Sequence, residues 1–369
     1  MMQPIFSQAQ FRSEGWVQWP DNEDLSVELM RLLGSAQEGG ATVSECFLTA
    51  SRIDASDEDS WHREWKRIAD ASSERGNAAL RNGNLLTARS NWLRSANYHQ
   101  ASMLNLDHGD RRRRSALASI RANVGKYLEQ LPGAEVVEIP WVEDHPLEGY
   151  FLRGRDRSPV VVCIGEPGHR KEEYLYKTAR YAHDRGMSLL AVDLWGPGDN
   201  VDFDQIAGRS DLETAICSVM DFLTFRDDVD ERRVAIVGDV GSSFVARGVA
   251  LDQRFAAAVC DAGLWDLHER QFLTGRAASQ SSDLAGMNGY SGITRQLRCP
   301  VLVTFGEHGW LEADQVTELF EQVRGTHPDI SLKFFRGSET AASQGHSDNP
   351  TLANEFIFDW LAQRFEQLG

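Results

Sequence analysis

The hydrophobic pattern changes once along the chain, near Gly133. Before that point, apolar residues between Asp57 and Leu131 recur every three or four positions, which is typical of helices that bury one face. The recurring positions are Trp61, Trp65, Ile68, Leu85, Ala88, Trp92 and Ala96. The pattern predicts a helical region over residues 56–132. It assigns no role to residues 1–55, where short apolar runs alternate with glycines.

After Gly133, short runs of β-branched residues replace the helical spacing. They predict strands at Val136–Val142, Val160–Ile164, Leu189–Val192, Val234–Val237, Ala256–Cys260, Val301–Phe305 and Ile330–Phe335. Helical stretches fall between most of these strands, at Glu172–Arg185, Leu212–Phe225, Ser243–Leu251, Ala313–Arg324 and Leu352–Phe365. This alternation is typical of an open, doubly wound, mostly parallel sheet. The sequence therefore predicts an α/β domain over residues 133–369 with an N-terminal helical cap.

Composition narrows the class of partner. Hydrophobic residues make up 41% and charged residues 25% of the 369 residues, as in folded proteins. Lys and Arg number 38 against 55 Asp and Glu, and the formal net charge of −17 repels nucleic acid and anionic lipid. The basic run Arg111–Arg114 lies among helix-forming residues and predicts a solvated helix face. We expect neither a nucleic-acid partner nor a membrane partner.

The cysteines and the N-terminal residues indicate the cellular compartment that we expect for the protein. The five cysteines are widely spaced and form no Cys-x-x-Cys pair, which indicates neither a zinc knuckle nor a disulfide framework. Residues 1–19 lack the basic and apolar regions of a signal peptide, and no apolar run has the length of a membrane span. The sequence predicts a cytoplasmic protein with reduced thiols.

One strand leads directly into a tight turn and a helix. After Val234–Val237 the chain reads Gly238, Asp239, Val240, Gly241, Ser242, Ser243. This unit resembles the nucleophile elbow of the α/β-hydrolase superfamily, small-x-nucleophile-x-Gly, centred on Asp239. An aspartate there resembles haloalkane dehalogenases and epoxide hydrolases. The resemblance implies that the carboxylate forms an alkyl-enzyme ester, which water then hydrolyses.

The same resemblance implies a histidine base and a carboxylate that orients it. His346 lies after the last predicted strand and before the final helix, the family's place for the base. In the loop after the penultimate strand, Gly309 stands where the family commonly has aspartate. Asp261, at the end of the preceding strand, is the candidate for a relocated acid, and a capping role in the turn is the alternative. The reserve candidates are Glu307, Glu312 and Asp266.

The loop after the first central strand resembles the family's His-Gly-x-Pro oxyanion loop, with Gly165, Glu166 and Pro167 in order. The backbone amides of Gly165 and Val240 are the implied donors to developing negative charge. Glu166 and Val240 replace the halide-binding asparagine and tryptophan of haloalkane dehalogenases, which argues against halide release. Like-charge repulsion with Asp239 raises the pKa of at least one of the two carboxyls, so Glu166 is a candidate catalytic acid. A solvent-facing loop glutamate is the alternative.

A wider resemblance covers roughly Ser60 to Phe365. It is to the FrsA-like and 2,6-dihydroxypseudooxynicotine hydrolase-like branch, in which a helical cap precedes the hydrolase domain. The stretches that carry it are Trp92–His99, Lys171–Glu173, Asp184–Met187 and Gly196–Gly198. Characterised types in this branch cleave carbon–carbon bonds of β-diketone-like or polyketide substrates, or esters, through a serine, histidine and aspartate triad. This chain departs from the pattern at the serine and at the acid.

Three readings of the function stay open at this point. The first is a hydrolase with Asp239 as nucleophile, His346 as base and Asp261 as orienting acid, acting on an epoxide or a carbon–halogen bond. The second uses Asp239 and His346 as acid and base for carbon–carbon cleavage, decarboxylation, elimination or cyclisation of a polyketide-like or aromatic substrate. The third is an inactive binding or regulatory homologue.

The expected ligand is a small apolar or aromatic molecule bound near the elbow. Trp195, Trp310 and His169 follow predicted strands and are candidate pocket residues. The turn around Asp239 lacks the spacing of a dinucleotide or phosphate loop. We therefore expect no nucleotide, no metal and no other cofactor, and leave a homodimer open.

Overall fold

The computed structural model describes residues 10–12, 15–19, 21–107, 109–142, 145–155, 157–165, 169–196, 209–239, 243–264, 295–309, 313–325, 327 and 329–368. The chain divides into two compact units. The first comprises Met1–Ala134 together with Glu172–Arg180, and the second comprises Glu135–Lys171 and Tyr181–Gly369. Within the described ranges, no helix combines the length and the apolar character that crossing a bilayer requires.

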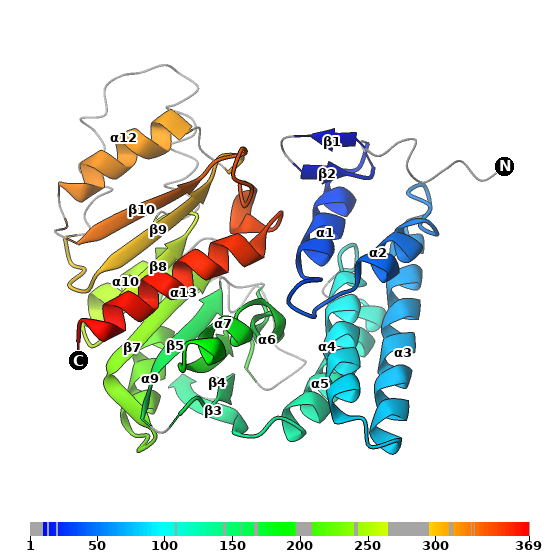
Figure 1. Cartoon of the computed structure of the whole chain (residues 1–369), viewed down its shortest axis with the longest axis horizontal. Helices are drawn as coiled ribbons and strands as arrows, with labels where there is room; N and C mark the ends of the chain where they lie inside the picture. The colour runs from blue at the N-terminus through cyan, green and yellow to red at the C-terminus, as the bar shows by residue number, and fades with distance from the viewer. Residues whose placement is uncertain are drawn as a thin grey trace. The chain divides into compact units, whose positions relative to one another are not determined.

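The first unit is helical apart from a small hairpin. Its elements are β1 (Gln10–Arg12), β2 (Gly15–Val17), α1 (Glu23–Gly34), α2 (Val43–Ala50), α3 (Ser60–Arg81), α4 (Leu85–Ala101), α5 (Arg111–Glu129) and α6 (Tyr174–Lys177). Figure 1 shows α3, α4 and α5 side by side. Leu29 of α1 and Cys46 of α2 share one hydrophobic core with Trp61 and Trp65 of α3. The described part of residues 1–55 therefore packs with the helices predicted from the tryptophan spacing.

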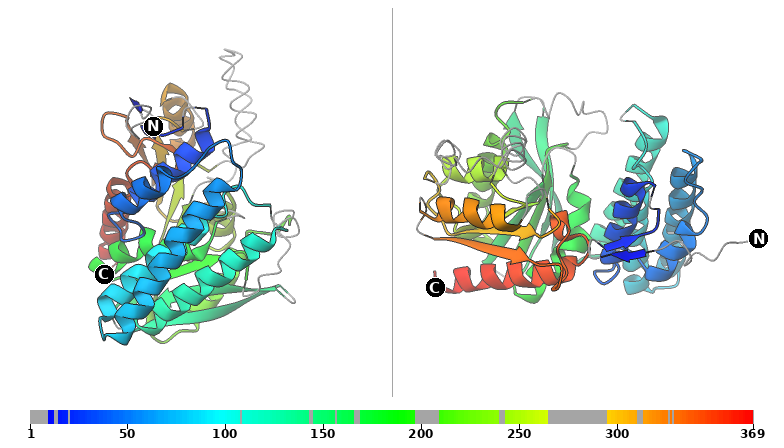
Figure 2. Two further views of the ribbon diagram at one scale, coloured as in Figure 1. Left: turned by 90° about the vertical axis from the view of Figure 1, so that its right-hand side faces the viewer. Right: turned by 90° about the horizontal axis from the view of Figure 1, so that it is seen from above.

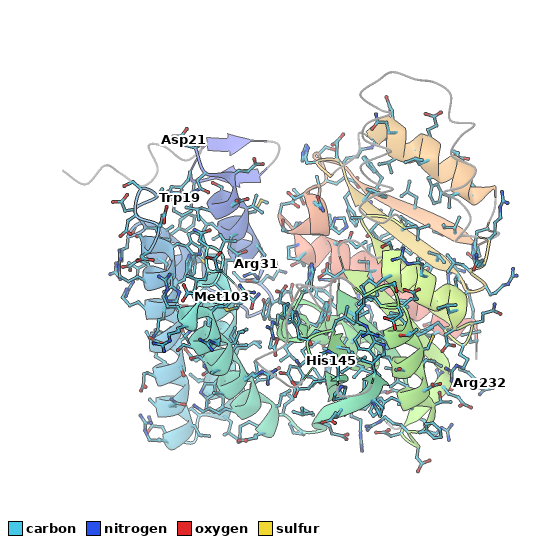
Figure 3. All side chains as sticks on the ribbon, turned by 180° about the vertical axis from the view of Figure 1, so that it is seen from behind. Trp19, Asp21, Arg31, Met103, His145 and Arg232 are labelled. Atoms are coloured by element: carbon cyan, nitrogen blue, oxygen red, sulfur yellow. The ribbon has the colours of Figure 1, made fainter. Side chains whose placement is uncertain are left out.

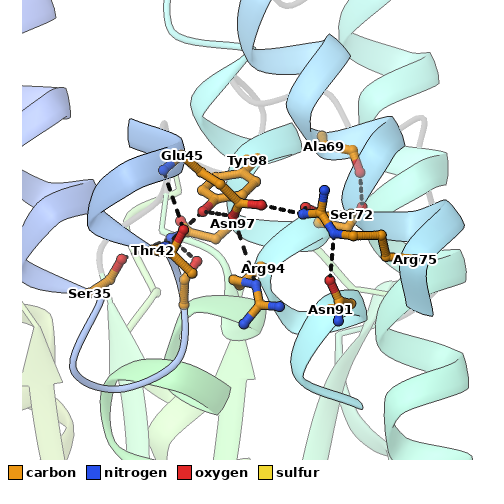
Figure 4. Close-up of polar contacts among 12 residues, drawn as sticks. Ser35, Thr42, Glu45, Ala69, Ser72, Arg75, Asn91, Arg94, Asn97 and Tyr98 are labelled. Atoms are coloured by element: carbon orange, nitrogen blue, oxygen red, sulfur yellow. Dashed lines mark hydrogen bonds and ion pairs between the residues drawn. The ribbon is translucent and has the colours of Figure 1, made fainter. Parts of the chain in front are cut away.

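A network of polar contacts crosses the helices of this unit (Figure 4). The carboxylate of Glu45, on α2, accepts hydrogen bonds from the hydroxyl of Tyr98 at 2.7 Å and from the guanidinium of Arg75. The amide of Asn97 donates to Ser35 Oγ at 3.0 Å and to the Gly40 carbonyl at 2.9 Å. These contacts satisfy polar groups that the packed helices remove from water.

The segment Glu172–Arg180 joins this network through Tyr176. The Tyr176 hydroxyl donates to Asn97 Oδ1 at 2.9 Å and lies 3.2 Å from the guanidinium of Arg31, which Figure 3 labels. A Cβ at Gly40 would lie 2.7 Å from the Tyr176 ring, so the close approach of the ring requires glycine there. Burial raises the pKa of Tyr176, and its hydroxyl remains neutral.

The second unit contains an eight-stranded sheet in the order β10-β9-β8-β7-β5-β6-β4-β3. Its strands are β3 (Ala134–Val142), β4 (His145–Leu152), β5 (Ser158–Gly165), β6 (Ser188–Asp193), β7 (Val229–Asp239), β8 (Ala257–Asp261), β9 (Val301–Gly306) and β10 (Ile330–Phe335). The six strands from β10 to β6 in this order are parallel, and β4 is antiparallel to β6. The predicted open, mostly parallel sheet is confirmed.

Helices cover both faces of the sheet. They are α7 (Ala179–Asp184), α9 (Thr214–Thr224), α10 (Ser243–Leu251), α12 (Ala313–Arg324) and α13 (Pro350–Glu366). Figure 2 shows α9 and α10 on one side of the sheet and α13 on the other. Tyr181 of α7 stacks on Phe358 of α13 with ring centroids 5.9 Å apart. The central strand β5 is buried on both faces, which explains its unbroken run Val160, Val161, Val162.

A buried ion cluster lies beside β5. The Nζ of Lys171, whose side chain is fully buried, is 3.2 Å from Asp193 Oδ2 at the end of β6 and 3.1 Å from Glu148 Oε1 on β4. The backbone N–H of Lys171 also donates to Asp193 Oδ2, at 3.2 Å. The cluster fixes the segment after β5 to the two strands on one side of it.

We expect Lys171→Met to lower the free energy of unfolding by about 3 kcal/mol or more, because it leaves two carboxylates without their buried cation. Urea denaturation measures this. Arg324→Met is the control in the same unit, since Arg324 and Glu321 are about two-thirds exposed and their pairing contributes about 0.5 kcal/mol or less. Equal effects of the two substitutions would contradict a structural role for the cluster.

Candidate active site

The candidate site lies at the carboxyl ends of neighbouring parallel strands, where open α/β sheets bind ligands. Asp239 is the last residue of β7 and Asp261 the last residue of β8. Gly165, at the end of β5, lies opposite Asp239 in the strand register, and Thr304 of β9 lies opposite Asp261. Both aspartates are buried, each with 5% of its residue surface exposed, so charged forms of their carboxyl groups need neighbouring groups that stabilise them.

Asp261 contacts His346. Its Oδ1 is 3.0 Å from His346 Nε2 and accepts a hydrogen bond from Thr304 Oγ1 at 2.9 Å. The other ring nitrogen, Nδ1, lies 2.7 Å from the carbonyl oxygen of Ala341. A carbonyl can only accept a hydrogen bond, so Nδ1 carries a proton, and the carboxylate of Asp261 lies at ion-pair distance from Nε2, where it stabilises the ring once Nε2 has taken up a proton. Asp261 is thus positioned to orient His346 and to stabilise its positive charge.

The loop that carries His346 has a strained backbone. Thr340, Ala341 and His346 have φ angles of 68°, 56° and 55°, in the left-handed region that non-glycine residues rarely adopt. Asp348 fixes this loop, because its two carboxylate oxygens accept hydrogen bonds from the backbone N–H groups of Ala342 and Ser343, each at 3.0 Å. Strain of this kind persists only where surrounding contacts determine it, and it is frequent at functional sites.

Asp239 has a different histidine beside it, His169. His169 Nδ1 lies 3.8 Å from Asp239 Oδ2, and the side chains of these residues are 30% and 6% exposed. His169 belongs to the segment after β5, which Lys171 anchors two residues later. The sequence predicted His169 as a pocket residue only, whereas the structure brings it to the predicted nucleophile.

The structure describes some of the other predicted site residues and not others. Glu166, Val240 and Trp310 lie outside the described residues. Trp195 follows β6, is buried, and donates its backbone N–H to Asp193 Oδ1 at 3.1 Å. Of the reserve acids, Glu307 accepts a hydrogen bond from the Gly337 N–H, and Asp266 and Glu312 lie outside the described ranges.

Sequence reasoning missed two residues that bear on His346. Thr304 is a hydroxyl residue within the apolar run of β9, and such an interruption is a usable signal. Asp348 stands two residues after His346 and has no signal of its own, since loop aspartates are common. Cys260, next to Asp261, is no nucleophile, because burial raises the pKa of its thiol well above the ordinary value. Among the described residues, no His, Cys, Asp and Glu cluster could hold a metal ion.

Comparisons with known proteins bear on the fold of the chain. No family model matches the sequence. The hydrolyase PoxO of Penicillium oxalicum is 31% identical over 67% of this chain, and the 20-hydroxy-prefusarin hydrolase FUS2 of Gibberella moniliformis is 31% identical over 66%. The matches span 62% and 61% of those proteins, so the chain covers about three fifths of the length of these relatives.

Two solved structures share the fold over nearly the whole chain. The 2,6-dihydroxy-pseudo-oxynicotine hydrolase superposes with a TM-score of 0.67 at 19% identity, over 90% of this chain and 95% of that one. AbyA5 superposes with a TM-score of 0.57 at 17% identity, over 95% of this chain and 100% of that one. The chain has the α/β-hydrolase fold. The expectation of this fold from the sequence is therefore confirmed.

In this α/β-hydrolase fold, we expect Asp348→Asn to loosen the loop that carries His346. An amide offers one acceptor oxygen where the carboxylate offers two, so the free energy of unfolding should fall by about 1–3 kcal/mol. Hydrogen exchange at the Ala342 and Ser343 amides should accelerate at least tenfold. Asp359→Asn, which alters a carboxylate that is 62% exposed, is the control and should leave both amides unchanged. Unchanged exchange in Asp348→Asn would rule out the proposed role of this carboxylate.

Proposed function

We propose that this chain is a hydrolase of small secondary metabolites in which Asp239 is the covalent nucleophile, His346 the base and Asp261 the carboxylate that orients His346. The observation that carries the proposal is the position of Asp239 at the end of β7, beside β8, whose last residue contacts His346. The names of the relatives PoxO and FUS2 support hydrolysis, and FUS2 is named for a prefusarin substrate.

For an epoxide, the proposed reaction forms an ester on Asp239 and then hydrolyses it. A carboxylate oxygen of Asp239 attacks a ring carbon, the ring carbon–oxygen bond breaks, and the alkoxide takes a proton from protonated His169. Water then loses a proton to His346 and attacks the carbonyl carbon of the ester. The acyl carbon–oxygen bond breaks, the diol leaves with the proton from His346, and the carboxyl proton of Asp239 returns to His169.

A specific contact favours a second function. His346 Nδ1 is already 2.7 Å from the Ala341 carbonyl while Nε2 faces Asp261, which suits a lasting imidazolium acid. In that case Asp239 is the base, and the reaction is carbon–carbon cleavage, decarboxylation or cyclisation of a polyketide-like substrate. Covalent attack at Asp239 distinguishes the two functions.

Isotope transfer tests the covalent step. Repeated turnover of styrene oxide in heavy-oxygen water should place the label in Asp239, because water attacks its ester carbonyl. Trypsin releases residues 234–247, a peptide in which Asp239 is the only acidic side chain, and mass spectrometry reads the label. The peptide of residues 255–270, which contains Asp261, is the internal control and should stay unlabelled. Turnover of the 1,3-diketone benzoylacetone without label would contradict the covalent route and support the acid/base function.

Substitutions separate the two proposed carboxylate roles. With styrene oxide as substrate, Asp239→Asn should abolish turnover, and Asp261→Asn should lower kcat at least about 100-fold because His346 loses its orienting charge. Thr304→Val removes one hydrogen bond to Asp261 and should lower kcat only about threefold to tenfold. An effect of Asp261→Asn below threefold would leave Asp261 as a turn residue.

A further inference from the structure

Arg170 is a buried cation that pairs with no carboxylate of the described residues. The residue is 6% exposed and lies between His169 and Lys171 in the segment after β5. Its guanidinium carbon is 4.5 Å from the centroid of the Trp195 ring. Within the part of the chain that the structure describes, this stacking is its only recorded interaction, with neither an ion pair nor a hydrogen bond.

Other largely buried cations of the chain have acidic partners. Lys171 pairs with Asp193 and Glu148, and the guanidinium of Arg31 pairs with Glu28 at 2.7 Å. Stacking on an aromatic face is worth about 2 kcal/mol when desolvated, less than the cost of burying a charge without an anion. A guanidinium has five N–H donors that point outward in its own plane. A tryptophan ring stacked on its face accepts a hydrogen bond from none of them. Arg170 therefore has the donors to bind an anion, and the described residues supply none.

The position of Arg170 is that of a ligand subsite. Arg170 and Trp195 follow β5 and β6, adjacent parallel strands, at the edge of the sheet where Asp239 also lies. One carboxylate fixes both segments, because Asp193 accepts hydrogen bonds from the backbone N–H groups of Lys171 and Trp195. The cation and the ring are thus held in place before any ligand binds, which reduces the entropy lost on binding.

We propose that Arg170, stacked on Trp195, binds an anionic oxygen pair of the substrate, either a carboxylate or the enolate of a 1,3-dicarbonyl. Both groups present two oxygens in one plane, which matches the fork of guanidinium donors. A formal net charge of −17 repels anions in general, so a local buried cation is what selects an anionic ligand. The proposed subsite gives the hydrolase proposed above its substrate class. Binding of an anion at Arg170 does not depend on that function, but the identification of the anion as a substrate does.

Matched anionic and neutral probes test the subsite without turnover. The probes are 2-naphthoate and its uncharged isostere 2-naphthamide, and calorimetry measures their binding. We expect the wild-type chain to prefer the naphthoate. Arg170→Gln should weaken naphthoate binding at least tenfold and change naphthamide binding less than twofold, whereas Arg170→Lys, which keeps the charge, should recover part of the loss.

A control substitution at another stacked arginine and a measurement of stability accompany the binding experiment. Arg209 also stacks on a tryptophan, Trp141 at 5.1 Å, but pairs with Asp211, so Arg209→Gln should leave naphthoate binding unchanged. Arg170→Gln should unfold at the same or a higher urea concentration, because it removes an uncompensated buried charge. Equal binding of both probes by the wild type, equal loss of both in Arg170→Gln, or strong destabilisation by that substitution would overturn the proposal. Binding is read without turnover, so these outcomes are independent of whether Asp239 is a nucleophile.

Discussion

The site depends on the burial of Lys171 between Asp193 and Glu148. An ammonium taken out of water is stable only beside compensating charge, and the two carboxylates come from strands on one side of β5. Because the backbone N–H of Lys171 also donates to Asp193, the pairing fixes the main chain as well as the side chain. The two preceding residues, His169 and Arg170, are therefore held at the carboxyl edge of the sheet.

The same short stretch then contributes to the other unit. Directly after Lys171 the chain enters Glu172–Arg180, which belongs to the helical unit and binds it through Tyr176, Asn97 and Arg31. A single run of residues thus carries a histidine beside Asp239, a buried cation, the ionic anchor and a segment packed among the helices. Residues 169–171 and residues 172–180 are therefore consecutive parts of one backbone segment.

Chain order and periodicity account for what the sequence could predict. Helical spacing located α3 and α4, and β-branched runs located seven of the strands, with Asp239 and Asp261 at the ends of β7 and β8. Strand β4 was missed because it contains no β-branched residue and includes Pro146 and Gly149, which are unusual inside strands. Since parallel strand ends share one edge, order along the chain was enough to group the candidates.

The contacts that distinguish this site were beyond the sequence because they depend on burial. Arg170, between a histidine and a lysine, resembles a solvated surface residue, and its burial follows from the tertiary position of Trp195. The pairing of Asp348 with two loop amides depends on left-handed φ angles at Thr340 and Ala341, which no residue type there favours.

In the proposed mechanism an aspartate takes the place of a serine nucleophile, so the site has to stabilise a negative charge before the reaction begins. A serine is neutral at rest, and negative charge appears during the reaction, where oxyanion donors stabilise it. Asp239 and Asp261 instead place two buried carboxylates on neighbouring strands, and each has a histidine beside it. In the proposed mechanism, ester formation removes the charge from Asp239 and transfers it to the leaving oxygen. In the proposed mechanism, His169 donates a proton to that oxygen and Arg170 binds an anionic group of the substrate, so one short segment serves both the leaving oxygen and the ligand.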